Sequence, residues 1–72
     1  MRTYTNIYKI ANDILSSTEE EVFDIIRYYT TYKQDEDETD EDFEENIEKE
    51  YVKIRAKAFR KIAEILENQA KE

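Results

Sequence analysis

The chain contains neither glycine nor proline among its 72 residues. These two residue types supply the backbone conformations on which tight hairpins and the corners of barrels depend. Their absence favours helices that are joined by polar loops. We therefore expect an all-α fold, a small three-helix bundle in which a short helical hairpin packs on a long C-terminal helix.

The hydrophobic periodicity predicts three helices in a single domain that covers residues 1–72. The helices are expected at about residues 5–15, 19–33 and 40–70, with an acidic linker at residues 34–39. At 1.5 Å per residue, the third helix would be about 45 Å long, roughly twice the length of either short helix. The short helices cannot then cover both its apolar second half and its acidic first half.

Each of the two short helices has one apolar face. Thr3 or Thr5 is the expected cap of the first helix, whose face comprises Tyr4, Ile7, Tyr8, Ala11, Ile14 and Leu15. A capping box from Thr18 to Glu21 precedes the second helix. The face of the second helix comprises Val22, Ile25, Ile26, Tyr29 and Tyr32. Phe23 and Tyr28 lie off its opposite edges, where they either widen the core, which we expect, or meet a partner.

The third helix, with Thr39 or Asp40 as its cap, has two apolar stripes. Its inner stripe comprises Phe43, Ile47, Tyr51, Ile54, Ala58, Ile62 and Ile65. Its second stripe, which begins after Tyr51, comprises Val52, Phe59, Ala63, Leu66 and Ala70. A wide apolar arc of this kind predicts burial against two neighbouring helices.

The composition argues against most classes of chemistry. Without cysteine or histidine, the chain has no disulfide, no thiolate and neither the commonest metal ligand nor the commonest general base. A comparison of the acidic run with an EF-hand calcium loop fails, because position six is Asp40 instead of glycine and position twelve is Asn46 instead of glutamate. We expect no enzymatic activity, no catalytic residues, no metal and no cofactor.

The net charge of -8 opposes direct binding to nucleic acid and to an anionic membrane surface. No apolar run approaches the roughly 18 residues of a membrane span, and the N-terminal stretch lacks the apolar core of a signal peptide. We expect a cytoplasmic protein that does not associate with membranes and that lies in the host cytoplasm if it is viral.

The charge is distributed unevenly along the third helix. Residues 35–50 carry eleven acids and one base, whereas residues 51–61 carry five bases and no acid. Carboxylates projecting at close spacing from a rigid helix can take the place of phosphates on a basic protein surface. We therefore expect a protein-interaction module, in one form an inhibitor that acts as a DNA mimic on a nucleic-acid-binding site. Its partner-binding residues would be Asp35, Glu36, Asp37, Glu38, Asp40, Glu41, Asp42, Glu44 and Glu45.

Two alternatives remain open. In the first, the protein is a homodimer in which two copies of the third helix pair antiparallel about residues 49–50. The interface would comprise Phe43, Ile47, Glu48, Tyr51, Ile54 and Arg55. In the second, which the net charge disfavours, Lys53, Lys57, Arg60 and Lys61 bind nucleic acid. The bias toward Ile, Lys, Asn, Tyr and Glu is typical of AT-rich coding sequences, such as those of many phages, viruses and plasmids.

Overall fold

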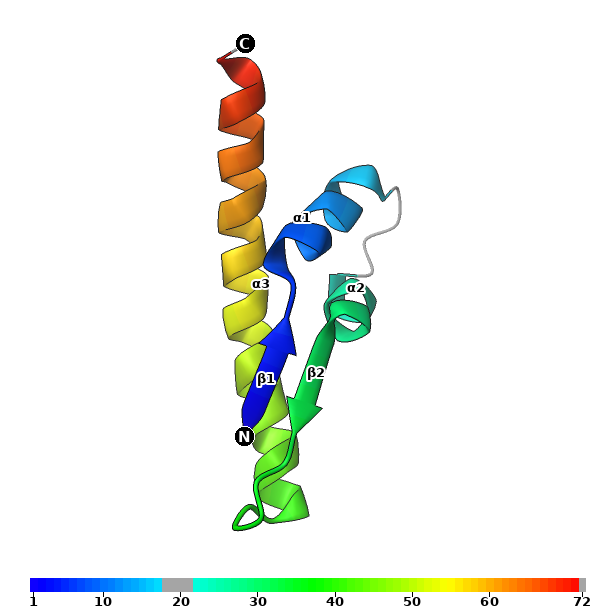
Figure 1. Cartoon of the computed structure of the whole chain (residues 1–72), viewed down its shortest axis with the longest axis vertical. Helices are drawn as coiled ribbons and strands as arrows, with labels where there is room; N and C mark the ends of the chain where they lie inside the picture. The colour runs from blue at the N-terminus through cyan, green and yellow to red at the C-terminus, as the bar shows by residue number, and fades with distance from the viewer. Residues whose placement is uncertain (18–21, 72) are drawn as a thin grey trace.

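The computed structural model describes residues 1–17 and 22–71 and has an elongated shape of 50 × 22 × 14 Å. Its elements are β1 (Arg2–Thr5), α1 (Ile7–Ser16), α2 (Val22–Tyr29), β2 (Thr30–Lys33) and α3 (Asp40–Ala70). α3 runs the length of the molecule, and the shorter elements lie along one side of it (Figure 1). The fold is mostly helical, as predicted. The prediction of an all-α fold is nevertheless wrong, because two segments form a small sheet.

α3 begins and ends where the sequence predicted. Thr39 is its N-cap, and the side-chain hydroxyl of Thr39 accepts a hydrogen bond from the backbone N–H of Asp42 at 3.1 Å. The first turn holds Asp40, Glu41 and Asp42, where the positive end of the helix dipole stabilises acidic side chains. The acidic segment therefore starts this helix instead of preventing it.

The core is formed where α1 and α2 pack on the middle of α3. Ile10 of α1, Ile26 of α2, and Ile54 and Ala58 of α3 form one buried cluster. Ile10 and Ile26 have no exposed surface, and burial of such a side chain stabilises a fold by about 1.5–3 kcal/mol. Half-buried side chains surround the cluster, namely Ile7, Ile14, Val22, Ile25, Tyr29, Tyr32 and Tyr51.

The sheet joins two segments that are far apart in the sequence. β1 and β2 pair antiparallel, with Arg2 opposite Lys33 and Thr5 opposite Thr30. The hydroxyl groups of Thr5 and Thr30 are hydrogen-bonded at 2.6 Å. Threonine and tyrosine favour extended backbone over helix. The sheet needs no glycine or proline, because the two helices, instead of a tight turn, connect its strands.

The boundaries of the short helices differ from the prediction for the same reason. Residues 30–33, predicted as the end of the second helix, form β2, and α2 ends at Tyr29. α1 begins at Ile7, and its cap is Asn6 instead of Thr3 or Thr5. The side chain of Asn6 accepts a hydrogen bond from the backbone N–H of Lys9 at 3.1 Å. The predicted capping box at residues 18–21 lies outside the described residues.

The apolar face of α1 is rotated from the predicted one. Ile10, which the prediction omitted, is fully buried, whereas Tyr4 and Tyr8 are 55% and 58% exposed. Tyr4 belongs to β1, so it cannot mark a helical face. Without Tyr4, the buried and half-buried apolar residues of α1 follow the spacing i, i+3, i+4, i+7, which is a complete helical face. In α2, Tyr28 does not widen the core, since its side chain is 81% exposed.

The sheet helps to cover the part of α3 that the short helices cannot reach. Its inner face carries half-buried Thr3 and Tyr32 and buried Thr30, whereas the residues of its outer face are exposed. Burial, and next the nearby carboxylate of Glu50 on α3, raise the pKa of the Tyr32 phenol. Tyr32 therefore extends the core toward the acidic half of α3.

Candidate functional site

The acidic linker before α3 is a folded turn. The backbone N–H of Glu38 donates to the carbonyl oxygen of Asp35 at 3.1 Å, which closes a four-residue turn. The side-chain amide of Gln34 donates to the carbonyl oxygen of Glu38 at 2.7 Å and to the carboxylate of Asp40 at 3.0 Å. These bonds attach the turn to the start of α3.

Glu38 is the centre of this arrangement, and only 7% of its side chain is exposed. Its carboxylate accepts hydrogen bonds from the backbone N–H of Asp35, at 3.2 Å, and from the side-chain amide of Asn46 on α3. It also lies 3.6 Å from the α-ammonium group of Met1. Because its oxygens are engaged within the chain, Glu38 holds the turn in place. The sequence analysis had instead placed Glu38 among the residues that project toward a partner.

Asp35 is also paired within the chain, although its side chain is 52% exposed. Its carboxylate forms an ion pair with the α-ammonium group of Met1 at 2.5 Å. A hydrogen bond from that ammonium group is the main cause that lowers the pKa of Asp35, and Arg2 contributes. The same bond is the main cause that raises the pKa of the ammonium group. The start of β1 is thereby tied to the acidic turn.

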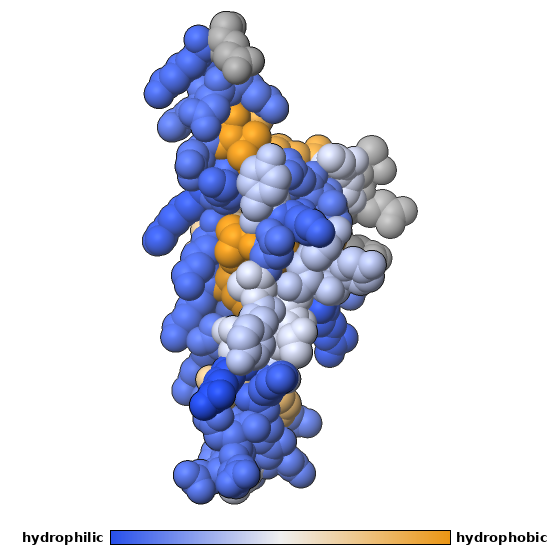
Figure 2. All heavy atoms as spheres, in the orientation of Figure 1, coloured by the Kyte–Doolittle hydropathy of each residue, from blue (hydrophilic) through white to orange (hydrophobic). Residues whose placement is uncertain are grey.

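The other acidic side chains project into solvent. Asp40 bonds to Gln34, and six further carboxylates are exposed and make no ion pair within the described part of the chain. We call these six carboxylates the acidic end: Glu36, Asp37, Glu41, Asp42, Glu44 and Glu45. Figure 2 shows that this end of the molecule is almost entirely hydrophilic, whereas apolar surface is visible further along α3.

An open hollow lies beside the acidic turn. It is lined by residues 34–38 and by Arg2 and Lys33 of the two strands. The ammonium group of Lys33 lies 5.5 Å from the ring centre of Tyr4, so this base packs on the sheet and leaves the acidic end unpaired. Arg2 and Lys33 therefore lie beside the acidic turn, although the sequence analysis had not connected these two bases with the acidic run.

The predicted dimer interface is divided by the fold. Ile54 is only 2% exposed and belongs to the core, so it is not accessible to a second copy. Tyr51 packs edge-on against Phe23 of α2, with the two ring centres 4.6 Å apart. The guanidinium group of Arg55 lies 5.8 Å from the centre of the Tyr51 ring. Phe43 and Ile47 are half-buried, whereas Glu48 is exposed. These residues therefore do not form a continuous free seam.

The second apolar stripe of α3 was predicted to be buried against two neighbouring helices, and that prediction is wrong. Val52, Phe59 and Leu66 are 53%, 48% and 49% exposed, and Ala63 and Ala70 are exposed too. α1 and α2 both pack on the inner stripe. The second stripe remains bare.

α3 carries a basic patch that comprises Lys53, Lys57, Arg60 and Lys61, and two of these bases are paired with acids. Lys53 pairs with Glu50 at 3.5 Å, and Lys61 pairs with Glu64 at 3.4 Å. Both pairs are local contacts one turn apart, which contribute only a few tenths of a kcal/mol each at a surface. They nevertheless place carboxylates among the bases that a phosphate backbone would have to approach.

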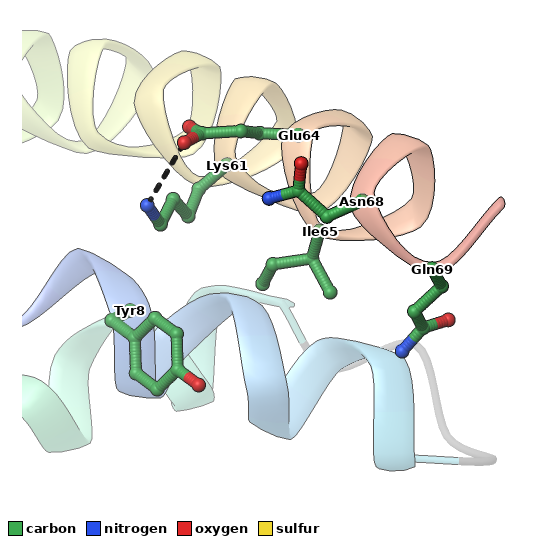
Figure 3. A pocket seen from close by; sticks show the side chains of 6 residues that line it. All are labelled: Tyr8, Lys61, Glu64, Ile65, Asn68 and Gln69. Carbon is green, nitrogen blue, oxygen red and sulfur yellow. Dashed lines mark hydrogen bonds and ion pairs between the residues drawn. The ribbon is translucent and has the colours of Figure 1, made fainter. Parts of the chain in front are cut away.

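The diverging ends of α1 and α3 leave an open groove of about 250 Å³. Tyr8 lies on the α1 side of the groove and the Lys61–Glu64 ion pair on the α3 side (Figure 3). The other lining residues are Ile65, Asn68 and Gln69. The ammonium group of Lys61 lies 5.9 Å from the Tyr8 ring centre, so a cation–π contact connects the two sides of the groove.

Residues 1–17 and 22–71 form neither a cluster suited to a metal ion nor a helix suited to crossing a membrane. No cluster of three or more carboxylates there has a geometry that could hold a metal ion. None of the helices formed by those residues combines the length and the apolar character that crossing a bilayer requires.

Comparison with models of protein families, with curated proteins and with solved structures found no match to this chain. Any assignment of function therefore rests on the chain's own residues and geometry.

Proposed function

We propose that this protein is an interaction module whose acidic end binds a basic surface on another protein. One observation carries the proposal. The six carboxylates of the acidic end are exposed and form no ion pair with any residue that the structure describes, while a separate set of side chains, Gln34, Glu38 and Asn46, fixes the backbone that presents them. Glu38, the acid that holds the turn, is not one of these six residues.

Electrostatics supports this division. Asp40 and Glu44, and likewise Glu41 and Glu45, are like-charge pairs four residues apart on one helix, an arrangement that destabilises a helix by about 0.2–0.5 kcal/mol per pair. A basic residue in place of one acid of each pair would remove this repulsion. A chain that concentrates unpaired acids on an ordered helix start loses stability and gains a strongly negative surface, which speeds association with a basic partner.

The inhibitor hypothesis is a narrower form of the proposal. Exposed carboxylates on a turn and on the first turns of a helix resemble a short row of phosphates in charge. A basic surface that normally holds nucleic acid would accept them. In this form the protein competes with nucleic acid for its target and does not bind nucleic acid itself.

The test compares two variants with equal charge changes. Glu41→Gln with Glu45→Gln neutralises two carboxylates of the acidic end, and Glu64→Gln with Glu67→Gln neutralises two carboxylates near the other end of α3. Proteins captured from an extract of the source organism are compared at low and high salt. We expect a captured protein that binds the wild type and the Glu64/Glu67 variant, binds the Glu41/Glu45 variant at least tenfold more weakly, and dissociates at high salt.

Addition of duplex DNA then tests the inhibitor form, since DNA should displace the captured protein if both use one basic surface. Equal capture by the two variants would contradict the proposal. Stronger binding of DNA by the Glu41/Glu45 variant than by the wild type would favour the nucleic-acid alternative instead.

A further inference from the structure

The bare stripe of α3 has the spacing of a coiled-coil seam. Six exposed apolar residues follow one another at intervals of four, three, four, three and four: Val52, Ala56, Phe59, Ala63, Leu66 and Ala70. This is the alternation of the two apolar positions of a heptad repeat, which average 3.5 residues apart. The stripe is about 27 Å long at 1.5 Å per residue. We call it the outer seam.

The outer seam is separate from the core contact of the same helix. At roughly 100° per residue, its centre lies about 130° around α3 from the line of Ile54 and Ala58, on which α1 and α2 pack. No described element covers it, since Val52, Phe59 and Leu66 are each about half exposed. A contiguous apolar strip of this length on a small protein is typical of an interaction site.

Large and small side chains alternate strictly along the outer seam. One heptad position carries Val52, Phe59 and Leu66, and the other carries Ala56, Ala63 and Ala70. A partner that fits this relief must present small residues opposite large ones, because packed interfaces tolerate neither clashes nor voids. The chain itself has such a surface when it is turned end to end.

We propose that a second copy of this chain covers the outer seam, with the two α3 helices antiparallel and centred on Lys61. In this register, residues equally far from Lys61 on either side face each other. Phe59 faces Ala63 of the second copy, Leu66 faces its Ala56, and Val52 faces its Ala70. Every large side chain thus meets an alanine. A parallel pair would instead stack Phe59 on Phe59 and leave a gap between the two copies of Ala63.

Charge favours the same arrangement. The segment from Lys53 to Lys61 carries five bases and no acid, whereas residues 62–71 carry Glu64, Glu67 and Lys71. An antiparallel pair places the basic segment of one copy beside the weakly acidic segment of the other, with Lys53 close to Glu67. A parallel pair would align the two basic segments. Arg60 is the exception, because the central axis brings it close to its own copy.

This register differs from the one that the sequence suggested. A pairing about residues 49–50 would require Tyr51 and Ile54, which pack on α2 and in the core. The pairing about Lys61 uses only residues that are exposed in the chain. It leaves residues 40–51 beyond the end of the partner helix, so the two acidic ends would stand roughly 55–60 Å apart at the opposite ends of the dimer. The inference does not depend on what the acidic end binds.

Single cysteines test the register directly, because the chain has none of its own. Ala56→Cys mixed with Leu66→Cys should form a disulfide-linked dimer under mild oxidation. Neither variant alone should do so, because in the proposed register two copies of position 56 lie about 15 Å apart along the axis, beyond the roughly 7 Å that a disulfide can span. Lys57→Cys mixed with Glu64→Cys is the matched control, since these positions lie at a similar level outside the outer seam.

Sedimentation of the full chain measures the association itself. Ala63→Glu should weaken dimerisation at least tenfold, whereas Asn68→Glu, which adds the same charge outside the outer seam, should change it less than threefold. Circular dichroism should show that both variants keep the helical content of the wild type, because both positions are exposed.

Three results would overturn the proposal. They are cross-linking of Ala56→Cys to itself, equal cross-linking of the control pair, and a wild-type chain that stays monomeric at the highest concentration tested. Loss of partner capture by the Glu41/Glu45 variant would leave this proposal unaffected, because those residues lie outside the paired segment.

Discussion

Replacement of Glu38 by alanine should destabilise this strongly acidic chain, although it removes one negative charge. Its carboxylate accepts hydrogen bonds from Asn46 and from the backbone N–H of Asp35, with 7% of the side chain exposed. Glu36 lies two residues earlier in the same turn, is exposed and makes no ion pair with residues 1–17 or 22–71. The two residues therefore separate the effect of bonding from the effect of net charge.

The expected magnitude follows from these contacts. Each hydrogen bond contributes about 1 kcal/mol net, so Glu38→Ala loses about 2 kcal/mol. Relief of repulsion from the neighbouring carboxylates returns a few tenths of a kcal/mol for each neighbour at a surface. The net loss should be about 1–2 kcal/mol in the free energy of unfolding, which lowers Tm by roughly 5–15 °C for a chain of this size. Glu36→Ala has only the favourable contribution, so it should leave Tm unchanged or raise it slightly.

Thermal unfolding followed by circular dichroism measures both variants, and a double-mutant cycle with Asn46→Ala isolates the side-chain contact. The coupling between Glu38 and Asn46 should exceed 0.5 kcal/mol, which is the lower limit for residues in direct contact. Amide exchange should also become faster across residues 34–46 in Glu38→Ala and not in Glu36→Ala. If both variants raise Tm, net charge dominates and Glu38 does not hold the turn.

Three further predictions concern the core, the helix cap and the response to pH. Ile54→Ala should destabilise the fold by about 2–5 kcal/mol and leave little folded protein, since Ile54 is 2% exposed, and denaturant titration measures this loss. Thr39→Ala should cost about 1 kcal/mol and delay the start of α3, whereas Thr31→Ala on the exposed face of the sheet should cost less than about 0.5 kcal/mol, as urea midpoints would show. The ion pair between Met1 and Asp35 should stabilise the wild type most fully between pH 4 and 8. The pKa of Asp35 is lowered from 3.8, so its contribution is lost as the pH falls through the lowered pKa. The pKa of the ammonium group is raised from 8.0, so its contribution is lost as the pH rises through the raised pKa. Asp35→Asn should flatten the profile of Tm against pH at both ends, and an unchanged profile would show that the pair contributes nothing.

The long helix could be predicted because its signals agree at every level. Thr39 offers a cap, acids fill the first turn, and apolar residues recur at helical spacing up to Ala70. The inner stripe was also predicted correctly at its most buried positions, Ile54 and Ala58. In this part of the chain, local preference and tertiary packing favour the same structure.

The strands could not be separated from the helices by periodicity alone. Tyr4 and Tyr32 fall at positions that continue the helical faces next to them. The prediction therefore placed Tyr4 on the face of the first helix and all of residues 30–33 in the second helix. The threonines were the contrary signal, since Thr3, Thr5, Thr30 and Thr31 flank those tyrosines and favour extended backbone. The pairing itself joins residues about thirty positions apart, and no local pattern encodes such a contact.

The acidic run shows why composition alone does not define a binding surface. As a sequence, its carboxylates are equivalent, and all nine were predicted to bind a partner. The fold assigns Asp35, Glu38 and Asp40 to internal contacts through residues that precede and follow the run, namely Met1, Gln34 and Asn46. These partners lie 34, 6 and 8 positions from the acids that they contact, so no helical or strand spacing points to them, and this division became visible only in the structure.

The two stripes of α3 explain why so short a chain forms a helix of 31 residues. The core that α1 and α2 form on the inner stripe centres on Tyr51, Ile54 and Ala58, so it would need a much shorter helix. The remaining length carries two features that α1 and α2 do not use, the acidic end before the core and the outer seam that continues past it. A helix that only completed the core would need neither Phe59 nor Leu66, each of which leaves about half of a large apolar side chain in water. We infer that the excess length serves contacts with other molecules.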